Sequence, residues 1–445
     1  MSSLSATTEP GIIEKSDSDR TTKGLTVLTA AILIAGEMAG SGVLALPRAV
    51  ADTGWIGILL IAVCCFNSGY TGTRLGLCWT IVEERYPKYR ISSRAPYPII
   101  GRKAFGKYMG ILVSVCIAFT LIGTATVVLL LTAQMLHSLF INNSFSICYW
   151  ILIIGGFLTP FCWLGSPKDF WYLALGGLIA TALACIFTFV QTILDKEHNI
   201  TPDPVNFKTP TLASFALGFG TIIFSFGGAS TFPTIQNDMK NRQFFPRSVV
   251  YAFIMLLIMY LPVAVSGFFI FGSSVSDNIV KSVTGGFFQT ATIILLCLHM
   301  FFAFVVIINP FSQQLEEILH IPTKLHWKRC VFRTFVVGLV IFIGESIPNF
   351  GSIMALIGGS TITLLTFVFP PLFYMRLCHQ KNPNWKTRKL TLHEQVYLVE
   401  LILIGLLGGV MSTWSAVTSI INNFTVAFPC YMKPNYKCYV ENCNT

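Results

Sequence analysis

The amino-acid sequence predicts an all-α integral membrane protein with about eleven transmembrane helices. Its composition is 53% hydrophobic and 11% charged, with a mean hydropathy of +0.68, whereas soluble domains carry about 25% charged residues. Apolar runs long enough to cross a bilayer recur along the chain. Two of these runs are interrupted by glycines at the same distance from a proline, which predicts two broken helices.

The apolar runs place the expected helices near residues 25–50, 54–82, 108–138, 147–165, 170–194, 213–235, 247–272, 286–311, 330–346, 349–376 and 395–421. The spans divide into two halves of five and an appended last helix. The predicted divisions are a disordered cytosolic tail at 1–24, a first five-helix repeat at 25–194, an extracytosolic loop at 195–212, a second repeat at 213–376, a cytosolic loop at 377–394, the last helix at 395–421 and an extracytosolic tail at 422–445. The first tail is polar and has no hydrophobic signal region.

Lysines and arginines gather in alternate connecting segments, most densely in 85–107, 240–247, 324–333 and 376–389. Because cytosolic loops carry the excess of positive charge, this bias predicts a cytosolic N-terminus and, for an odd number of spans, an extracytosolic C-terminus. The formal charge of +10 therefore reflects topology, and no nucleic-acid partner is expected. The three glycosylation sequons all fall on the predicted outer side, at Asn142, Asn199 and Asn423.

Four of the 13 cysteines are expected on the oxidising side of the membrane. They are Cys148, at the outer mouth of the fourth span, and Cys430, Cys438 and Cys443 in the C-terminal tail. We expect a disulfide among them, and four cysteines allow three full pairings between which the sequence does not choose. The other cysteines lie in apolar spans and are expected to be small buried side chains.

The first interrupted run, from Ala35 to Pro47, contains a carboxylate, Glu37, among several small residues. Glycine and proline weaken a helix, and backbone groups released inside a membrane need protein, water or a ligand as a new partner. A carboxylate at that depth costs a few kcal/mol and is typical of ion or proton sites. Small residues also allow close helix packing, so this run alone does not decide between a site and a packing contact.

A second run of the same design, from Phe224 to Pro233, favours a binding site. In both runs the proline follows the last glycine by five residues, from Gly42 to Pro47 and from Gly228 to Pro233. Matched interruptions in two halves of a chain point to a transporter's site near the middle of the membrane. The two runs begin an odd number of spans apart, so the halves are candidate repeats of inverted topology.

A helix break offers both of the poles that a zwitterion needs. Free N–H groups at the start of the second half-helix suit a carboxylate, and carbonyls at the end of the first half suit an ammonium or a cation. Phe226 and the region of Thr124 and Thr126 are expected as walls for the substrate's side chain. The residues expected to bind the backbone of an α-amino acid are Ala39, Gly40, Ser41, Gly42, Val43, Phe224, Ser225, Phe226, Gly227, Gly228 and Ser230.

Coupling to an ion requires a group whose charge or ligation changes with occupancy. Glu37 lies about one helical turn before the break and could carry a proton or help to hold sodium. His299, in the middle of the eighth span, is the other titratable candidate, although a histidine there is also compatible with a hydrogen-bonded core residue. No charged side chain other than Glu37 lies near the breaks, which favours small neutral amino acids by elimination.

Four stretches of the sequence resemble the amino acid/auxin permease family, within the amino acid-polyamine-organocation superfamily. Gly40–Gly57 is similar to the first-helix signature of that family, and Phe224–Gly228, Asn237–Lys240 and Gly358–Tyr374 are similar to its other patterns. The resemblance covers essentially the whole chain after the first tail. It implies the five-plus-five inverted-repeat fold of the bacterial leucine transporter, with the first and sixth helices broken.

The same resemblance implies secondary transport of amino acids driven by protons or sodium, with no other cofactor. By analogy with that fold, carbonyls near Gly36 and Ala39 would face the eighth helix and His299 at a cation site. Glu37 departs from the family's pattern, in which an uncharged residue is usual near this position. The departure leaves the coupling ion open between H⁺ and Na⁺ and favours the proton, because a carboxylate can carry one.

Other function classes fit the sequence less well. A channel would need a continuous polar pore, and no catalytic motif such as HExxH or GxSxG is present, so an enzyme is not expected. Two alternatives stay open: a vesicular transporter for GABA or glycine, and an amino-acid sensor that transports little. The expected partners are an amino-acid substrate and the lipid bilayer, in the plasma membrane or a lysosomal or vesicular membrane.

Overall fold

The computed structural model describes residues 24–90, 95–140, 146–163, 170–197, 205–322, 326–347, 349–424 and 429–432. Within this part of the chain the structure is helical, apart from an isolated bridge between Leu25 and Met239. Seven helical stretches are long and apolar enough to cross a membrane individually. They are α4 (Ile56–Arg85), α6 (Lys107–Leu139), α8 (Phe170–Glu197), α11 (Phe245–Phe271), α12 (Phe287–Ile318), α16 (Leu392–Phe424), and the continuous run of α14 (Phe350–Ile357), η5 (Gly358–Ile362), η6 (Leu364–Val368) and α15 (Phe369–His379).

The first expected span is a bent pair, α2 (Val27–Met38) and α3 (Ser41–Thr53), whose axes differ by 59°. The sixth is divided into α9 (Leu212–Ser225) and the short α10 (Phe232–Asn237). The two remaining expected spans coincide with α7 (Ile147–Trp163) and α13 (Trp327–Ser346). α7 and α9 are short for a span, and α13 begins with several basic residues. The all-α membrane fold is therefore confirmed, and the count of eleven spans stays a prediction.

The two divided spans begin in the same way. Thr26 accepts a hydrogen bond from the backbone N–H of Thr29, whose hydroxyl in turn accepts from the N–H of Thr26. Thr211 and Ser214 form the same reciprocal pair at the start of α9. Such a capping box satisfies free N–H groups in the first turn of a helix and stabilises that end. Each half therefore specifies its divided span with a matched start as well as a matched interruption.

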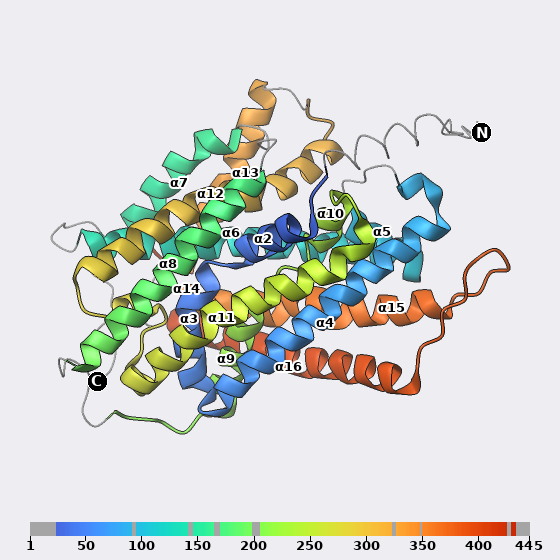
Figure 1. The fold of residues 1–445 in the computed structure, drawn as a ribbon. Helices are drawn as coiled ribbons and strands as arrows, with labels where there is room; N and C mark the ends of the chain where they lie inside the picture. Colours follow the sequence, from blue (N-terminus) through green and yellow to red (C-terminus); the bar gives the residue numbers. More distant parts are fainter. Residues whose placement is uncertain are drawn as a thin grey trace.

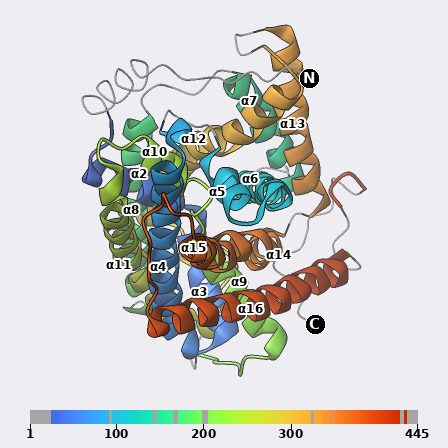
Figure 2. The same ribbon diagram turned by 90° about the vertical axis from the view of Figure 1, so that its right-hand side faces the viewer.

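The divided spans lie together in the middle of the bundle (Figure 1). There α3 packs against α9, and α11 packs against both α2 and α3. A second group is formed by α6, α7, α12 and α13, which pack on one another. Figures 1 and 2 both show α7 and α13 on the opposite side of the molecule from α16. The breaks are thus enclosed on one side by α6 and α12 and on the other by α11.

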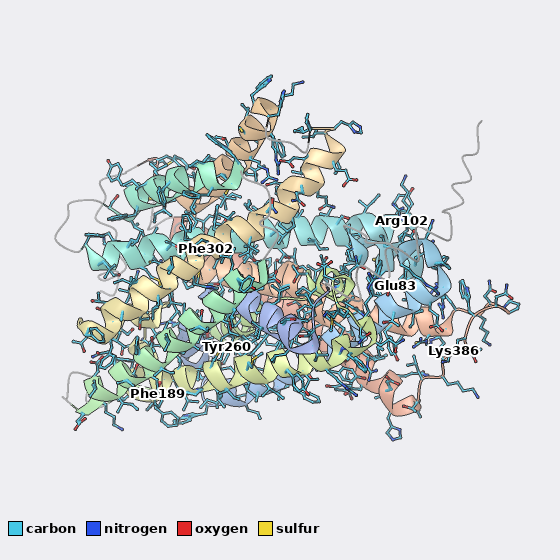
Figure 3. All side chains as sticks on the ribbon, turned by 45° about the horizontal axis from the view of Figure 1, so that its top comes forward. Glu83, Arg102, Phe189, Tyr260, Phe302 and Lys386 are labelled. Atoms are coloured by element: carbon cyan, nitrogen blue, oxygen red, sulfur yellow. A yellow bond between two sulfur atoms is a disulfide. The ribbon has the colours of Figure 1, made fainter. Side chains whose placement is uncertain are left out.

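Charged side chains gather at one end of the bundle, which we call the basic end and define by Arg85, Arg102, Arg242 and Lys386. Figure 3 shows Arg102 and Lys386 there, together with Glu83, and Phe189 at the other end. Along the helices, large apolar side chains face outward, among them Phe66, Ile258 and Val410, which are 67%, 68% and 69% exposed. Such a surface suits lipid rather than water, as expected for a multi-pass membrane protein.

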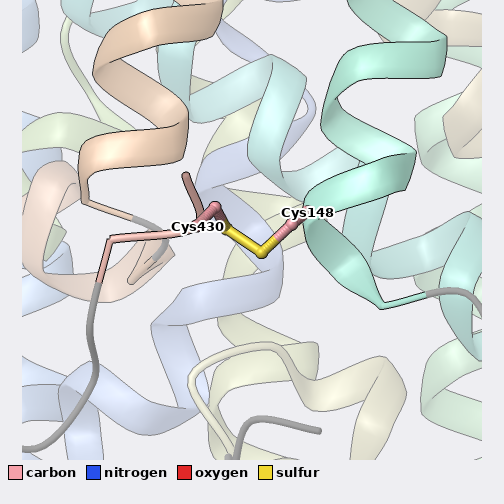
Figure 4. Close-up of a disulfide and its surroundings, with 2 residues drawn as sticks. All are labelled: Cys148 and Cys430. Atoms are coloured by element: carbon pink, nitrogen blue, oxygen red, sulfur yellow. A yellow bond between two sulfur atoms is a disulfide. The ribbon is translucent and has the colours of Figure 1, made fainter. Parts of the chain in front are cut away.

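A disulfide joins Cys148, at the start of α7, to Cys430 (Figure 4). It brings residues 429–432 against α13, where the N–H of Cys430 donates to the carbonyl oxygen of Glu345 at 2.9 Å and Tyr431 stacks on Phe342. The expected disulfide is therefore present, and the pairing that the sequence left open is Cys148 with Cys430. Cys438 and Cys443 lie outside the described residues.

Candidate functional site

The first break is imposed by one backbone conformation. After Met38 the chain is extended at Ala39, and Gly40 takes φ 139° and ψ −104°, which residues with a side chain rarely adopt. A Cβ at Gly40 would also lie 2.9 Å from Cε of Met300 and 3.0 Å from Nε2 of His299. The break therefore requires glycine at this position both for its torsion angles and for the space between α3 and α12.

The second break is longer, because α9 ends at Ser225 and α10 begins at Phe232. The ring of Phe226 leaves the break and packs 6.3 Å from Phe253 and 5.6 Å from Tyr260, between ring centroids. This packing anchors the end of α9 on α11. The segment that follows, which includes Gly227 and Gly228, is neither α-helical nor extended into a strand.

The breaks touch each other through their glycines. A Cβ at Gly42, in the first turn of α3, would lie 2.8 Å from Cα of Ser225, and one at Gly228 would lie 2.6 Å from Cγ of Met38. Real Cβ atoms do not approach so closely, so both positions depend on the absence of a side chain. The end of each first half-helix consequently lies against the break of the other span.

A cavity opens where the two breaks meet, bordered by α2, α3, α6, α9, α12 and η5. Its polar side chains are Glu37, Ser41, Thr124 and His299, and it has no lysine or arginine in its lining. The complete lining is Glu37, Met38, Ala39, Ser41, Thr124, Val128, Phe224, Gly227, His299, Met300, Ala303, Ile307 and Ile362. A cavity lined mainly by apolar residues, with a few converging polar groups, is the usual form of a small-molecule site.

Glu37 connects the two spans directly. Oγ1 of Thr231, at the end of the second break, donates to Oε2 of Glu37 at 2.8 Å and lies 3.0 Å from the carbonyl oxygen of Gly228. Among the described residues, Thr231 is the one hydrogen-bond partner of this carboxylate. A carboxylate held by a single hydroxyl inside a membrane protein is poorly compensated when it is ionised.

The carbonyls that the first break releases are satisfied by side chains from neighbouring helices. The hydroxyl of Tyr260, on α11, donates to the carbonyl of Met38 at 2.9 Å. Nε2 of His299, on α12, lies 2.9 Å from the carbonyl oxygen of Ala39. Because a carbonyl only accepts, Nε2 must carry the proton in this contact. Buried backbone groups need such partners, so α11 and α12 hold the first break in its non-helical form.

Comparison with known proteins places this arrangement in a family. A family model described as transmembrane amino acid transporter protein matches residues 23–418, which is most of the chain. The chain belongs to this transporter family. Amino acid transporter AVT1C of Arabidopsis thaliana is 26% identical over 409 residues, which are 87% of this chain and 68% of that relative. Amino acid transporter AVT3B of the same plant is 24% identical over 392 residues, 86% of this chain and 90% of the relative.

Solved structures are similar to the transporter in fold. A manganese transporter from Eremococcus coleocola has a TM-score of 0.57 at 13% identity, with 96% of this chain and 90% of that chain covered. MhsT in complex with L-phenylalanine has a TM-score of 0.55 at 14% identity, with 88% and 99% covered. These are transporters of the bacterial leucine-transporter fold, so the predicted fold is confirmed. The match of the family model confirms the predicted family resemblance. The expectation that the chain is not an enzyme is confirmed too, because the family is one of transporters.

The transporter brings some of the residues predicted for binding and coupling to the cavity and places others behind it. Those that line the cavity are Glu37, Ala39, Ser41, Phe224, Gly227 and His299. The others contact neighbouring helices or lie elsewhere in the breaks: Gly36, Gly40, Gly42, Val43, Ser225, Phe226, Gly228 and Ser230. Of the expected walls, Thr124 borders the cavity, whereas Thr126 donates to the carbonyl of Ile122 in its own helix.

Several residues of this site were not among the predicted ones. Thr231 and Tyr260 bind the first span through hydrogen bonds, and Val128, Ala303 and Ile362 form apolar walls. Thr231 lies in the second interrupted run, so its hydroxyl could have been noticed there. The sequons Asn142 and Asn199 lie outside the described residues; Asn423 lies in the last turn of α16, and its side chain is outside the described set.

Proposed function

We propose that this protein is a secondary active transporter that moves small neutral amino acids together with protons by alternating access. The observation that carries the proposal is the hydrogen bond between Glu37 and Thr231, which joins a titratable group of the first break to the second break at one cavity. An ion site and a substrate site that share two broken helices are placed to influence each other.

The cavity suits the two poles of an amino acid. α3 begins at Ser41, and its N-cap Gly40 provides no side-chain acceptor, so the first N–H groups of α3 are available to a carboxylate. Carbonyls of the unwound segment around Gly227 suit an ammonium group. Val128, Ala303 and Ile362 are apolar, and no lysine or arginine of the described residues lines the cavity. These walls favour a neutral amino acid over a dicarboxylic one.

A proton is the coupling ion that the geometry favours. Glu37 has one hydroxyl donor, Thr231, and an ionised carboxylate that is so weakly compensated is costly to enclose. Proton uptake removes that charge before the cavity closes. Sodium in such folds is coordinated by carbonyls that a helix break releases, whereas the carbonyl of Ala39 already accepts from His299.

The charge distribution supports an orientation with the basic end in the cytosol. The Cys148–Cys430 disulfide then lies on the opposite side, where an oxidising environment maintains such bonds. We propose the plasma membrane or a lysosomal or vesicular membrane as the location, because either has a compartment of this kind on that side.

The test is uptake of radiolabelled amino acids into proteoliposomes, with proton and sodium gradients imposed separately. We expect uptake of neutral amino acids driven by an inward proton gradient and unaffected by sodium. Uptake that follows sodium alone would remove the proton from the mechanism, and uptake driven by an outward proton gradient would replace symport with exchange. The variant Glu37→Gln should lose proton-driven accumulation and keep its insertion and folding; undiminished accumulation would exclude Glu37 as the carrier.

A further inference from the structure

Thr231 occupies a position between two hydrogen-bond acceptors from different spans. Its Oγ1 is 2.8 Å from Oε2 of Glu37, on α2, and 3.0 Å from the carbonyl oxygen of Gly228 in its own break. The backbone N–H of Thr231 donates to the same Gly228 carbonyl at 3.2 Å. Residues 228–231 therefore form a turn that is closed by the backbone and, in addition, by the threonine hydroxyl.

A hydroxyl has one proton to donate and can accept at its oxygen. When Glu37 is ionised, both neighbours of Oγ1 are pure acceptors, and the hydroxyl can donate fully to one of them only. When Glu37 is protonated, its O–H can donate to Oγ1, and the Thr231 hydroxyl is then free to donate to Gly228. Both short distances are satisfied together only in the protonated arrangement.

We propose that Thr231 is the positioning residue that converts protonation of Glu37 into a change in the second break. The inference deepens the proposed function and rests on it. One covalent bond forms, the O–H of Glu37, and its proton is given up by hydronium in the adjoining water. The hydroxyl of Thr231 keeps its own proton and rotates from Glu37 to the carbonyl of Gly228. Protonation thus adds a second hydrogen bond to the 228–231 turn, and loss of the proton removes it.

This turn is placed to affect substrate affinity. Gly227, which precedes it, lines the cavity, and Gly228 lies against Met38 with no room for a Cβ. A turn held by two hydrogen bonds keeps the backbone around Gly227 in a single arrangement, which lowers the entropy lost when an amino acid binds. By linkage, an amino acid that binds this arrangement raises the affinity of Glu37 for its proton by the same factor. That is the cooperativity that symport requires.

Other titratable groups face this region from the helices packed around α2, and the experiment has to separate them. They are His299 on α12, Tyr260 on α11, Cys185 on α8 and Asp238 just beyond α10. His299 bonds the carbonyl of Ala39, Tyr260 that of Met38, and Asp238 accepts through its backbone from Leu25. None of these contacts involves the Thr231 hydroxyl.

The test compares two substitutions of Thr231 that change the size of the side chain little and differ in whether the hydroxyl is kept. Thr231→Val removes the hydroxyl, and Thr231→Ser retains it. Thr192→Val, in α8, is the matched control, because among the described residues the Thr192 hydroxyl bonds only the carbonyl of Thr188 in its own helix. Binding of radiolabelled L-alanine, L-proline and L-leucine to each purified variant is measured at acidic and at neutral pH.

We expect wild type, Thr231→Ser and Thr192→Val to bind at least one probe more tightly at acidic pH, by about fivefold or more, as is usual for coupled sites. The measured quantity is the ratio of the dissociation constant at neutral pH to that at acidic pH. In Thr231→Val this ratio should fall to about one. If Thr231→Val keeps the wild-type ratio of the two dissociation constants, the proposed role of Thr231 is wrong. The same conclusion follows if the ratio falls to about one in Thr231→Ser. A variant that fails to bind at any pH is checked by its melting temperature, and a folded Thr231→Val that never binds also contradicts the proposal.

Two further variants distinguish failure of this inference from failure of the proposed function. Glu37→Gln, which mimics the protonated acid, should bind at both pH values as wild type does at acidic pH. If Glu37→Gln keeps the pH dependence and His299→Gln loses it, the proton carrier is His299 and the proposed coupling is wrong. If Glu37→Gln loses the pH dependence and Thr231→Val keeps it, the carrier is right and only the role of Thr231 is wrong.

Discussion

Nε2 of His299 lies 2.9 Å from the carbonyl oxygen of Ala39, so a side chain of α12 satisfies a backbone group that the first break releases. The edge of the imidazole that carries Nδ1 lies against Gly177 of α8, where a Cβ would collide with the ring. His299 is therefore fixed between α2 and α8.

Replacing His299 with Phe should disable the site while keeping a ring of similar size. The carbonyl of Ala39 would lose its donor, and an unsatisfied buried acceptor costs about 1–3 kcal/mol. We expect a lower melting temperature and loss of amino-acid uptake in proteoliposomes. His393→Phe, at an exposed position of α16, is the control and should behave as wild type. Normal uptake by His299→Phe would show that the Ala39 contact is dispensable.

Gly40→Ala adds only one methyl group, but we expect it to reduce both stability and uptake. The φ of 139° at Gly40 is unfavourable for alanine, and the new methyl group would meet Met300 and His299 at about 3 Å. We expect a loss of about 1–3 kcal/mol in stability and no measurable uptake. Gly338→Ala, in α13, is the matched control, because a Cβ there meets nothing within 4 Å. If both variants transport alike, Gly40 is not what maintains the break.

The sequence predicted where the spans are broken better than it predicted which residues unwind. Glycine spacing located both breaks, but Ser41, Gly42 and Val43 form the first turn of α3, since Ala39 and Gly40 together accomplish the change of direction. Gly42 is required because the backbone of α3 passes close to Ser225 there, and not because its torsion angles are unusual. Such a distinction depends on which surfaces meet, and neither composition nor periodicity contains that information.

Contacts between spans were the part that the sequence could not supply. Thr231 and Glu37 are 194 positions apart, and Tyr260 and Met38 are 222 apart, so no local pattern relates them. The capping boxes at Thr26 and Thr211 can be recognised from the sequence, because two hydroxyl residues three positions apart stand at the start of each divided span. The predicted helix starts did not include this pattern. The π-helical segments η5 and η6 had no such signal; there the carbonyl of Leu365 accepts from the hydroxyl of Tyr97.

The Cys148–Cys430 disulfide should contribute to stability. It closes a loop of 282 residues, and disulfides typically contribute about 2–4 kcal/mol. We expect Cys148→Ser, Cys430→Ser and the double variant to lower the melting temperature equally, because each removes the same bond. The measurement is thermal unfolding of purified protein with and without a thiol reductant, which should affect only wild type. A double variant clearly less stable than either single variant would indicate that the two cysteines act separately.

Arg242 and Glu83 form a buried ion pair at the basic end, between α4 and the segment after α10. Arg242 also donates from Nε and Nη2 to the carbonyl of Asn237, at 3.1 and 2.8 Å, so the pair holds the end of α10. Removing one partner of a buried pair costs about 3–5 kcal/mol, because it leaves an uncompensated charge. We therefore expect Glu83→Gln to lower the melting temperature strongly.

The adjacent residue on α4 provides the control for that variant. Glu84 pairs with Arg388 at 2.7 Å, and both side chains are partly exposed, by 41% and 27%. Exposed pairs contribute about 0–1 kcal/mol, so Glu84→Gln should melt close to wild type. Arg242→Met should reduce amino-acid uptake more than Glu83→Gln does. The arginine substitution also removes both hydrogen bonds to the carbonyl of Asn237, so the end of the short α10 loses its anchor. Equal melting temperatures for Glu83→Gln and Glu84→Gln would mean that water reaches the Arg242–Glu83 pair.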